Sequence, residues 1–496
     1  MVTARGDHVD LVRAVRLSGP LALTFGDEPV DLVIRDGRLA DAAPTGVLPP
    51  SGLVLDGEGR RVVAGLWDHH VHTVQWALNA DRVQLGEVHS AAEAARVMGD
   101  ADALADGRRV GAGMRDALWA DAPSLTLLDE RTGGRPTYLI NADVHSVWLN
   151  SAAFQREGFA PTEDGMLREE DAFEISRRLN AADDLTADAA VLRAGERAAA
   201  RGITGLVDFD MAWNAQAWRR RADAGFAAHR VEFAFYAADL PRAIAEGLRT
   251  GEELPGTNGL VHVGPLKLIT DGSLGTRTAA CSHAYDDDVT NFGVLTIDPD
   301  RLRDLLTQAT ASGIDAAVHA IGDRAVASAL DAFTYTQARG TIEHAQLVRH
   351  ADLARFARLG VVASVQPEHA VDDRDMVGSL WQHQRALSHP LASLFAAGIP
   401  VRFGSDAPVA PLDPWTTIAA AVHRTADERE PWQPAERVGV ASALRASSRH
   451  GDTDLEIGGA ADLVLCGADP LTADRAELSR MPVAATLLRG SLTHVE

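Results

Sequence analysis

Two histidines separated by one residue, His70 and His72, stand in the segment WDHHVHT. If this segment is a β-strand, residues two apart point to the same face, and the two imidazoles lie about 6.6 Å apart along the backbone. Such a pair suits a single metal ion, whereas His69 between them faces the other side. Strand histidines often only satisfy a hydrogen bond in a core, so the pair alone does not establish a metal site.

Four further residues that could bind a metal or take part in catalysis stand near the ends of apolar runs. His319 stands in AAVHAIGD, His344 in TIEHAQ, Asp406 in RFGSDAP and Lys267 in VHVGPLKLITDGSLG. In a parallel barrel the carboxyl ends of the strands converge on one mouth, where active sites of this fold lie. Four histidines and a carboxylate at that mouth form a nitrogen and oxygen donor set suited to Zn²⁺, and also to Fe²⁺ or Mn²⁺.

The elements that must position these residues read as a repeating α/β pattern. Eight apolar, strand-like runs alternate with segments of helical spacing, which is typical of a parallel sheet. The runs cover residues 61–72, 202–210, 230–239, 263–272, 313–323, 341–348, 360–370 and 399–408. Eight such units predict a closed (β/α)8 TIM barrel.

Two parts of the chain fall outside this repeat. Between the first two runs lies a large insertion with a predicted strand, PTYLIN, and a predicted helix, HSVWLNSAAFQREG. A connection this long favours a lid, residues 77–200, on the barrel of residues 63–449. The termini carry short strands, including a hairpin in VDLVIRDGRLADA, which predict a small composite β-sandwich from residues 1–62 and 450–496.

The order of these motifs resembles the amidohydrolase superfamily. That family carries H-x-H on strand 1, then lysine, histidine, histidine and aspartate on strands 4, 5, 6 and 8, which match, in this chain, His70, His72, Lys267, His319, His344 and Asp406. The stretches NADVHSVWLNSAAF, KLITDGSLGTRTA, VHAIGDRAV, IEHAQLV, SVQPEHA and GSDAPVAPLDPW are similar to the family 3 branch, which includes N-substituted formamide deformylases. The resemblance covers nearly the whole chain and departs from the family pattern at Ala64-Gly65 and at Val144.

The resemblance implies a role for Lys267, the single lysine of the sequence. A neutral lysine amine adds CO₂ to become a carbamate that bridges two cations, whereas guanidinium stays protonated and cannot. An N-carboxylated Lys267 would hold two metals about 3.5 to 4 Å apart, one bound by His70, His72 and Asp406 and the other by His319 and His344. Some members of the superfamily use one metal, and a lysine that is merely ion-paired in a loop is the simpler alternative.

The expected reaction is hydrolysis of a carbon–nitrogen bond other than a peptide bond, in an amide, formamide or cyclic amide. Metal ions lower the pKa of bound water to about 7, so that a metal-bound hydroxide can attack the carbonyl at neutral pH. Asp406 is the expected general base for that water and then the general acid for the leaving nitrogen.

Substrate contacts are less well defined by the sequence. An insertion residue, His145, could bind substrate or instead cap or pack against a helix, and an arginine after the fourth strand, Arg277, could hold a substrate carboxylate. Tryptophans in the stretches after barrel strands could line a pocket for a bulky apolar group or instead anchor loops; these are Trp76, Trp213, Trp381 and Trp415.

Three other interpretations remain open at this stage. A lone strand lysine forms a Schiff base in aldolases, although that interpretation leaves the histidines without a role. A deaminase of the same superfamily uses similar water chemistry but typically lacks the strand 4 lysine. A catalytically silent binding protein on this scaffold would be expected to have lost ligands, and this chain keeps the full set.

Composition limits the partners. The net charge of -23, without a basic run, argues against nucleic acid and anionic membranes and for a small-molecule substrate. We expect a cytoplasmic protein, because the first residues lack the pattern of a signal peptide and no apolar stretch is long enough for a membrane helix. Cys281 and Cys466 are expected to be reduced, and a homodimer stays open.

Overall fold

The computed structural model divides into two compact units. The first comprises Met1–Thr73 and Gly195–Glu496, and the second comprises Val74–Ala194. The structure describes residues 4–49, 52–80, 82–104, 106–116, 119–141, 146–168, 170–449 and 455–496. Within this part of the chain, no helix is long and apolar enough to cross a bilayer, and both cysteines are buried and free.

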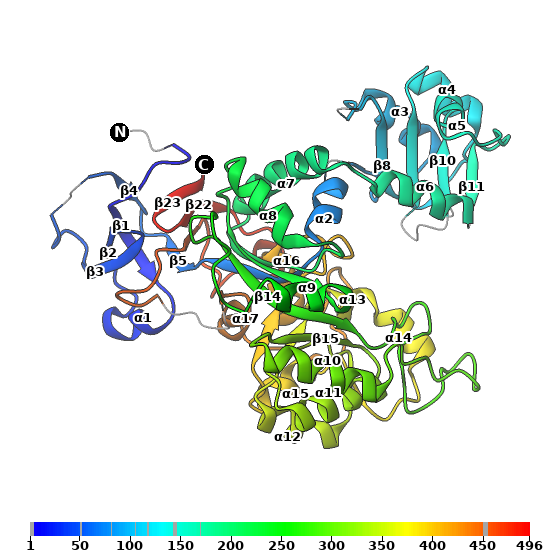
Figure 1. The fold of residues 1–496 in the computed structure, drawn as a ribbon. Coiled ribbons are helices and arrows are strands. Elements are labelled where there is room, and N and C mark those ends of the chain that lie inside the picture. Colours follow the sequence, from blue (N-terminus) through cyan, green and yellow to red (C-terminus); the bar gives the residue numbers. More distant parts are fainter. Residues whose placement is uncertain are drawn as a thin grey trace. The chain divides into compact units, whose positions relative to one another are not determined.

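The first unit is built around a parallel, eight-stranded sheet (Figure 1). Its strands, in spatial order, are β6 (Leu66–Val71), β12 (Ile203–Asp208), β13 (Arg230–Tyr236), β14 (Val261–Ile269), β15 (Ala316–Ala320), β16 (Gly340–His344), β18 (Val362–Val365) and β20 (Val401–Phe403). A parallel bridge between Val71 and Ala407 connects the last strand region to the first, so the sheet is nearly closed. The predicted eight-stranded barrel is confirmed.

The apolar runs give strands because both faces of this sheet are covered. All six residues of β6 and all six of β12 are buried, as expected for parallel strands that side chains cover from both sides. Helices follow the strands, among them α8 (Asn214–Asp223), α10 (Pro299–Ala311), α11 (Asp323–Thr336), α12 (His350–Leu359) and α16 (Pro414–His423). Asp298 caps α10, with Pro299 at its first position, which ends the preceding loop.

Strands from both ends of the chain form one further sheet in the first unit. Its order is β23-β22-β21-β5-β1-β2-β3, and β4 pairs with β1. The bounds are β1 Leu11–Leu17, β2 Val30–Arg35, β3 Arg38–Pro44, β4 Val54–Asp56, β5 Arg61–Ala64, β21 Leu463–Cys466, β22 Val483–Leu488 and β23 Ser491–Val495. The predicted hairpin is present, with Asp36 and Gly37 at positive φ. The two-layer sandwich and the domain boundaries stay predictions.

The second unit contains a five-stranded sheet in the order β11-β10-β9-β8-β7. The strands are β7 (Val83–Gln84), β8 (Arg109–Met114), β9 (Thr137–Asn141), β10 (Ser146–Leu149) and β11 (Met166–Arg168). Helices α3 (Ala91–Asp100), α4 (Leu125–Thr132), α5 (Ser151–Glu157) and α6 (Glu170–Asn180) complete it. The strand predicted in PTYLIN is therefore confirmed as β9, and the role of residues 77–200 as a lid stays a prediction.

The predicted helix in HSVWLNSAAFQREG is wrong in its first half. Ser146–Leu149 forms strand β10, which pairs antiparallel with β9 and β11. Three consecutive apolar residues, Val147 to Leu149, show neither helical nor strand periodicity, and the sheet buries all three. The helix begins only at Ser151, because the side chain of Asn150 accepts a hydrogen bond from the backbone N–H of Ala153 (2.9 Å) and caps it.

Candidate metal centre

The six predicted ligands lie at the carboxyl ends of the barrel strands or directly after them. Lys267 is on β14, His319 on β15 and His344 is the last residue of β16. His70 is on β6, and His72 and Asp406 follow β6 and β20. This is the end of a parallel barrel where functional sites are built.

One group of three donors forms around Asp406. The ligand atoms of His70, His72 and Asp406 all lie within 4.8 Å of one another. Asp406 Oδ1 is 3.2 Å from His72 Nε2 and 3.5 Å from His70 Nε2. The backbone holds this arrangement, because the N–H of Asp406 donates to the carbonyl of His70 (2.8 Å) and the N–H of His72 donates to the carbonyl of Ala407 (2.9 Å).

Lys267 reaches the same group from β14, which β13 and β12 separate from β6 in the sheet. Its side chain is 2% exposed, and Nζ lies 3.1 Å from His70 Nε2 and 4.1 Å from the centre of the Phe209 ring. Burial lowers the pKa of Lys267 from its ordinary value to about 8, against the opposing effect of Glu343 and Asp406. The amine is therefore much closer to its neutral form than an exposed lysine at the same pH.

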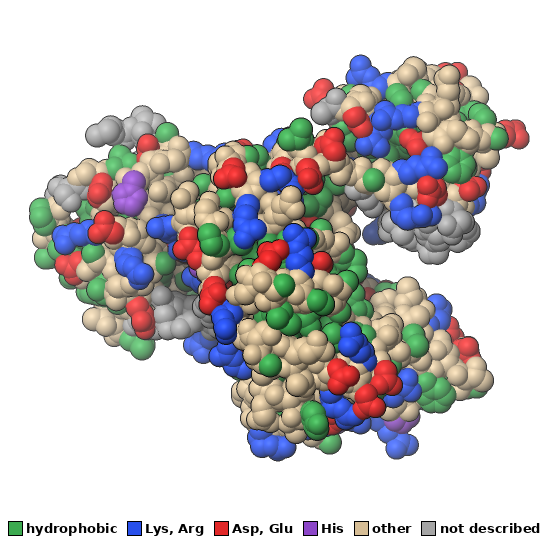
Figure 2. All heavy atoms as spheres, viewed as in Figure 1, with side chains coloured by type: hydrophobic (Ala, Val, Ile, Leu, Met, Phe, Trp, Pro, Cys, Tyr) green, Lys and Arg blue, Asp and Glu red, His purple; other side chains and the backbone are tan. Residues whose placement is uncertain are grey.

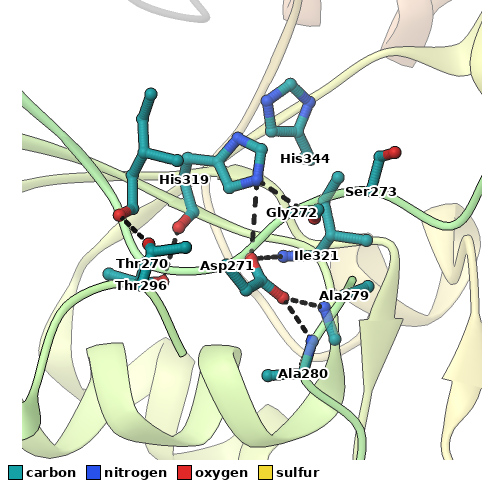
Figure 3. Close-up of polar contacts among 12 residues, drawn as sticks. Thr270, Asp271, Gly272, Ser273, Ala279, Ala280, Thr296, His319, Ile321 and His344 are labelled. Atoms are coloured by element: carbon teal, nitrogen blue, oxygen red, sulfur yellow. Dashed lines mark hydrogen bonds and ion pairs between the residues drawn. The ribbon is translucent and has the colours of Figure 1, made fainter. Parts of the chain in front are cut away.

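His319 and His344 lie next to each other on the adjacent strands. Their ring centroids are 4.5 Å apart, and Figure 3 shows the two rings side by side. His344 Nδ1 pairs with Gln366 Oε1 (2.9 Å), which leaves Nε2 as its electron-pair donor. His319 Nε2 faces the carbonyl of Gly272 at 3.4 Å and Asp271 at 3.5 Å, which leaves Nδ1 for a ligand.

The protonation states suit a metal. Burial lowers the pKa of His70 and of His344 well below the ordinary value, and it lowers the pKa of His319 to about 4. Metal-binding histidines must be neutral, so these rings are ready as ligands at neutral pH. Burial alone would raise the pKa of Asp406, but the neighbouring histidines together outweigh it and hold that pKa well below its usual range; these are His70, His72, His344 and His369.

Two buried carboxylates, Glu343 and Asp271, support the predicted ligands and were not predicted from the sequence. Glu343 is 1% exposed, and its Oε2 accepts from His70 Nδ1 at 2.7 Å, while Thr341 donates to its other oxygen. Asp271 accepts from three backbone N–H groups beside His319, and burial raises its pKa to about 7. A carboxylate inside a barrel strand, directly before the predicted ligand His344, was the available signal for Glu343.

The residues present fit a divalent cation. Their free atoms are imidazole nitrogens and carboxylate oxygens, which Zn²⁺ and related ions prefer. The Glu343–His70 pair is the carboxylate–histidine arrangement that typically orients a metal ligand. Nδ1 of His72 is buried and has no hydrogen-bond partner among the described residues, so a further ligand would satisfy this side chain.

The sequence model of the Amidohydrolase family matches residues 53–494. This chain belongs to the amidohydrolase family. The match agrees with the family resemblance that the motifs predicted, which is thereby confirmed. Family membership, with the metal-ligand groups at the barrel mouth, makes this amidohydrolase a hydrolytic, metal-dependent enzyme acting on amide-type bonds.

Two curated relatives and one solved structure illustrate the similarity. This amidohydrolase is 30% identical over 473 residues to the protein LONG AFTER FAR-RED 3 of Arabidopsis thaliana, which covers 86% of this chain and 80% of the relative. It is 25% identical over 520 residues to the N-substituted formamide deformylase of Arthrobacter pascens, covering 93% and 94%. The crystal structure of an uncharacterized metal-dependent hydrolase from Pyrococcus horikoshii has the same fold, with a TM-score of 0.78 and 23% identity over 94% of this chain and 99% of that one.

Two of the residues predicted to bind substrate, Arg277 and Trp76, belong to different units of this amidohydrolase. Arg277 is exposed and pairs with Asp287 (2.6 Å). Trp76 belongs to the second unit, and His145 lies outside the described residues. Their roles in binding stay predictions.

The other tryptophans make structural contacts. Trp213 stacks under the guanidinium of Arg242, 4.2 Å from the ring centre. Trp381 is 3% exposed within an apolar cluster of loop residues, and Trp415 is fully buried with its Nε1 donating to a backbone carbonyl. Trp415 is therefore a core residue, and a pocket role for Trp213 and Trp381 stays a prediction.

Proposed function

We propose that this protein hydrolyses the C–N bond of an amide, formamide or cyclic amide substrate with one or two Zn²⁺ ions, or Fe²⁺ or Mn²⁺ in their place. The observation that carries this proposal is the convergence of His70, His72, Lys267 and Asp406 in one buried cluster. The formamide deformylase among the curated relatives supports the same bond type.

The ligands divide between two positions. His70, His72 and Asp406 would hold one ion, and His319 and His344 a second, with an N-carboxylated Lys267 between them. When bound, the cation lowers the pKa of water and polarises the carbonyl under attack. Burial lowers the pKa of Lys267 to about 8 and so increases the fraction of neutral amine, which is the form that reacts with CO₂.

Asp406 would move the proton. Its backbone is fixed to β6, and its carboxylate faces both histidines of the H-x-H pair, which places a proton acceptor beside the proposed metal ligands. As a carboxylate it accepts the proton of that water, and as an acid it donates the proton to the leaving nitrogen. An amide nitrogen leaves readily only after it is protonated.

A substrate panel with a chelator tests the proposal. The purified protein is assayed with N-acyl amines, N-alkyl formamides, cyclic amides and esters, before and after incubation with dipicolinate. We expect amide or formamide turnover that the chelator removes and added Zn²⁺ restores. Covalent trapping on Lys267 by borohydride with a carbonyl substrate, together with full activity in chelator, would instead favour Schiff-base chemistry.

A further inference from the structure

One further histidine at the barrel mouth, His369, lies outside the predicted ligand set. His369 stands in the short helix α13 (Pro367–Asp372), which begins directly after β18. Its ligand atom lies within 4.8 Å of those of His344 and Asp406, and all three residues are buried or nearly so. The seventh strand, which contributes no ligand to the predicted set, therefore also contributes a side chain to the centre.

The imidazole of His369 has an unused nitrogen. The residue is 8% exposed, and its Nε2 is buried without a hydrogen-bond partner among the described residues. A buried polar atom of this kind is costly unless something pairs with it. Its backbone is fixed, because its N–H donates to the carbonyl of Gln366 (3.1 Å) and its carbonyl accepts from the N–H of Asp373 (2.8 Å).

These three side chains lie close together without all being bonded to one another. The rings of His369 and His344 are parallel within 10°, with centroids 6.2 Å apart. His72 is in contact with Asp406 at 3.2 Å, whereas no hydrogen bond or ion pair joins His369 and Asp406 in the described structure. His369 thus lies near the proposed proton-transfer group without being bonded to it.

The nearby residue Gln366 differs from His369 in its contacts. The Oε1 atom of Gln366 is occupied by His344 Nδ1, so Gln366 orients a ligand. Nothing comparable occupies His369, although both residues come from the same turn after β18. A group that is buried, held by its backbone and unpaired beside the reacting atoms is suited to an interaction formed with the substrate.

We propose that His369 is a catalytic residue that donates a hydrogen bond from Nε2 to the carbonyl oxygen of the substrate as negative charge develops there. The role requires only a proton on Nε2 and needs no proton transfer. This inference rests on the proposed function and adds to it the group that stabilises the oxyanion. It makes no use of His369 as a metal ligand.

Substitution of His369 with metal analysis tests the role. The variants are His369→Ala and His369→Gln, since the amide of glutamine retains an N–H donor, and each is loaded with Co²⁺. We expect the metal content and the Co²⁺ absorption spectrum to match wild type, kcat to fall about 10² to 10³-fold in His369→Ala, and KM to change less. His369→Gln should recover part of that loss.

The matched control is His229→Gln. His229 is 1% exposed, with a buried Nδ1 that has no hydrogen-bond partner among the described residues, and it precedes β13 at the amino end of the barrel strands. Its variant should keep the wild-type kcat. Loss of bound Co²⁺ in His369→Ala would show a metal ligand and overturn the proposal, and so would an unchanged kcat.

A binding measurement separates this inference from the proposed function. If the wild-type protein hydrolyses no amide, the proposed function fails, and acetohydroxamate can still be titrated into the Co²⁺-loaded protein, since its carbonyl oxygen accepts a hydrogen bond. Binding about five- to tenfold weaker in His369→Ala than in wild type would support the donor role. Equal affinity in the two proteins would overturn it.

Discussion

Nζ of Lys267 lies 3.1 Å from Nε2 of His70, although the two residues are 197 positions apart in the chain. Both side chains are almost completely buried, so the contact is made away from solvent. An ammonium here would donate a hydrogen bond to Nε2 of His70 and so occupy the lone pair that a metal ion needs. The proposed carbamate would leave that lone pair free, and arginine, which stays protonated, could not form it.

The first prediction concerns the replacement of that amine. Lys267→Ala should lose most of its activity and at least part of its metal, because the bridging oxygens are absent. Added formate or acetate should restore part of both by placing a carboxylate in the space that the shortened side chain leaves. Kinetics and metal analysis provide the check. They are carried out with formate or acetate at 0 to about 100 mM, because a small carboxylate is expected to bind such a cavity only weakly.

Lys267→Arg is the matched control for that experiment. The guanidinium fills the same space, so small carboxylates should not restore activity. Equal rescue of both variants, or a Lys267→Ala protein with full activity and full metal content, would contradict the bridging role.

A pH dependence of metal reconstitution follows from the same lysine. With its pKa lowered to about 8, the metal-free protein has about one-tenth of Lys267 neutral at pH 7 and about nine-tenths at pH 9. The protonated form is the unreactive one, so at a constant concentration of dissolved CO₂ reconstitution with Zn²⁺ should become faster as the pH rises through 8. Stopped-time activity assays after dilution to a common pH measure this; a rate independent of both pH and dissolved CO₂ would exclude carboxylation as a step.

The proton-transfer role of Asp406 predicts a severe effect of Asp406→Asn. The amide keeps the size of the side chain but cannot accept a proton, so kcat should fall by about 10² to 10⁴-fold or more, since a ligand is also weakened. Asp352→Asn is the matched control: Asp352 is 4% exposed but pairs with Arg349, and its loss should leave kcat unchanged. A near-wild-type rate for Asp406→Asn would refute the role.

The hydrogen bond between Glu343 and His70 should affect the affinity for the metal. Glu343→Gln weakens the hydrogen bond to His70 Nδ1 and should reduce the affinity for Zn²⁺ about 10- to 100-fold, measured by competition with a chromophoric chelator. Thr341→Val, which removes only the hydroxyl bound to the other oxygen of Glu343, should have a smaller effect. If the two variants bind Zn²⁺ as tightly as wild type, Glu343 does not orient the ligand.

Much of the barrel could be predicted because its strands are buried on both faces. Continuous apolar runs such as those of β6 and β12 stand out against the helices between them. In the second unit the same logic failed at Val147 to Leu149, since a short apolar run does not distinguish a strand from a helix. The sheet partners β9 and β11 decide the outcome there, and they are distant in sequence.

The candidate site was predicted where residue type and strand position agree. His70, His72, Lys267, His344 and Asp406 end strands that converge, and the structure places their side chains together. The supporting residues could not be found in this way, because Asp271 depends on backbone N–H groups that only the folded loops bring near. His369 was also missed. It is a single histidine in a short helix after a strand, and no neighbouring residue in the sequence indicates which way its side chain points.

Anomalous diffraction from crystals of the Zn²⁺-loaded protein shows directly whether these side chains bind the metal. We expect scattering peaks at about 2.0 to 2.2 Å from nitrogen atoms of His70 and His72 and from an oxygen of Asp406. If a second ion is bound, its peak should lie between His319, His344 and the modified Lys267. An active protein whose zinc peaks lie elsewhere, or which binds no metal at these side chains, would contradict the proposed metal centre.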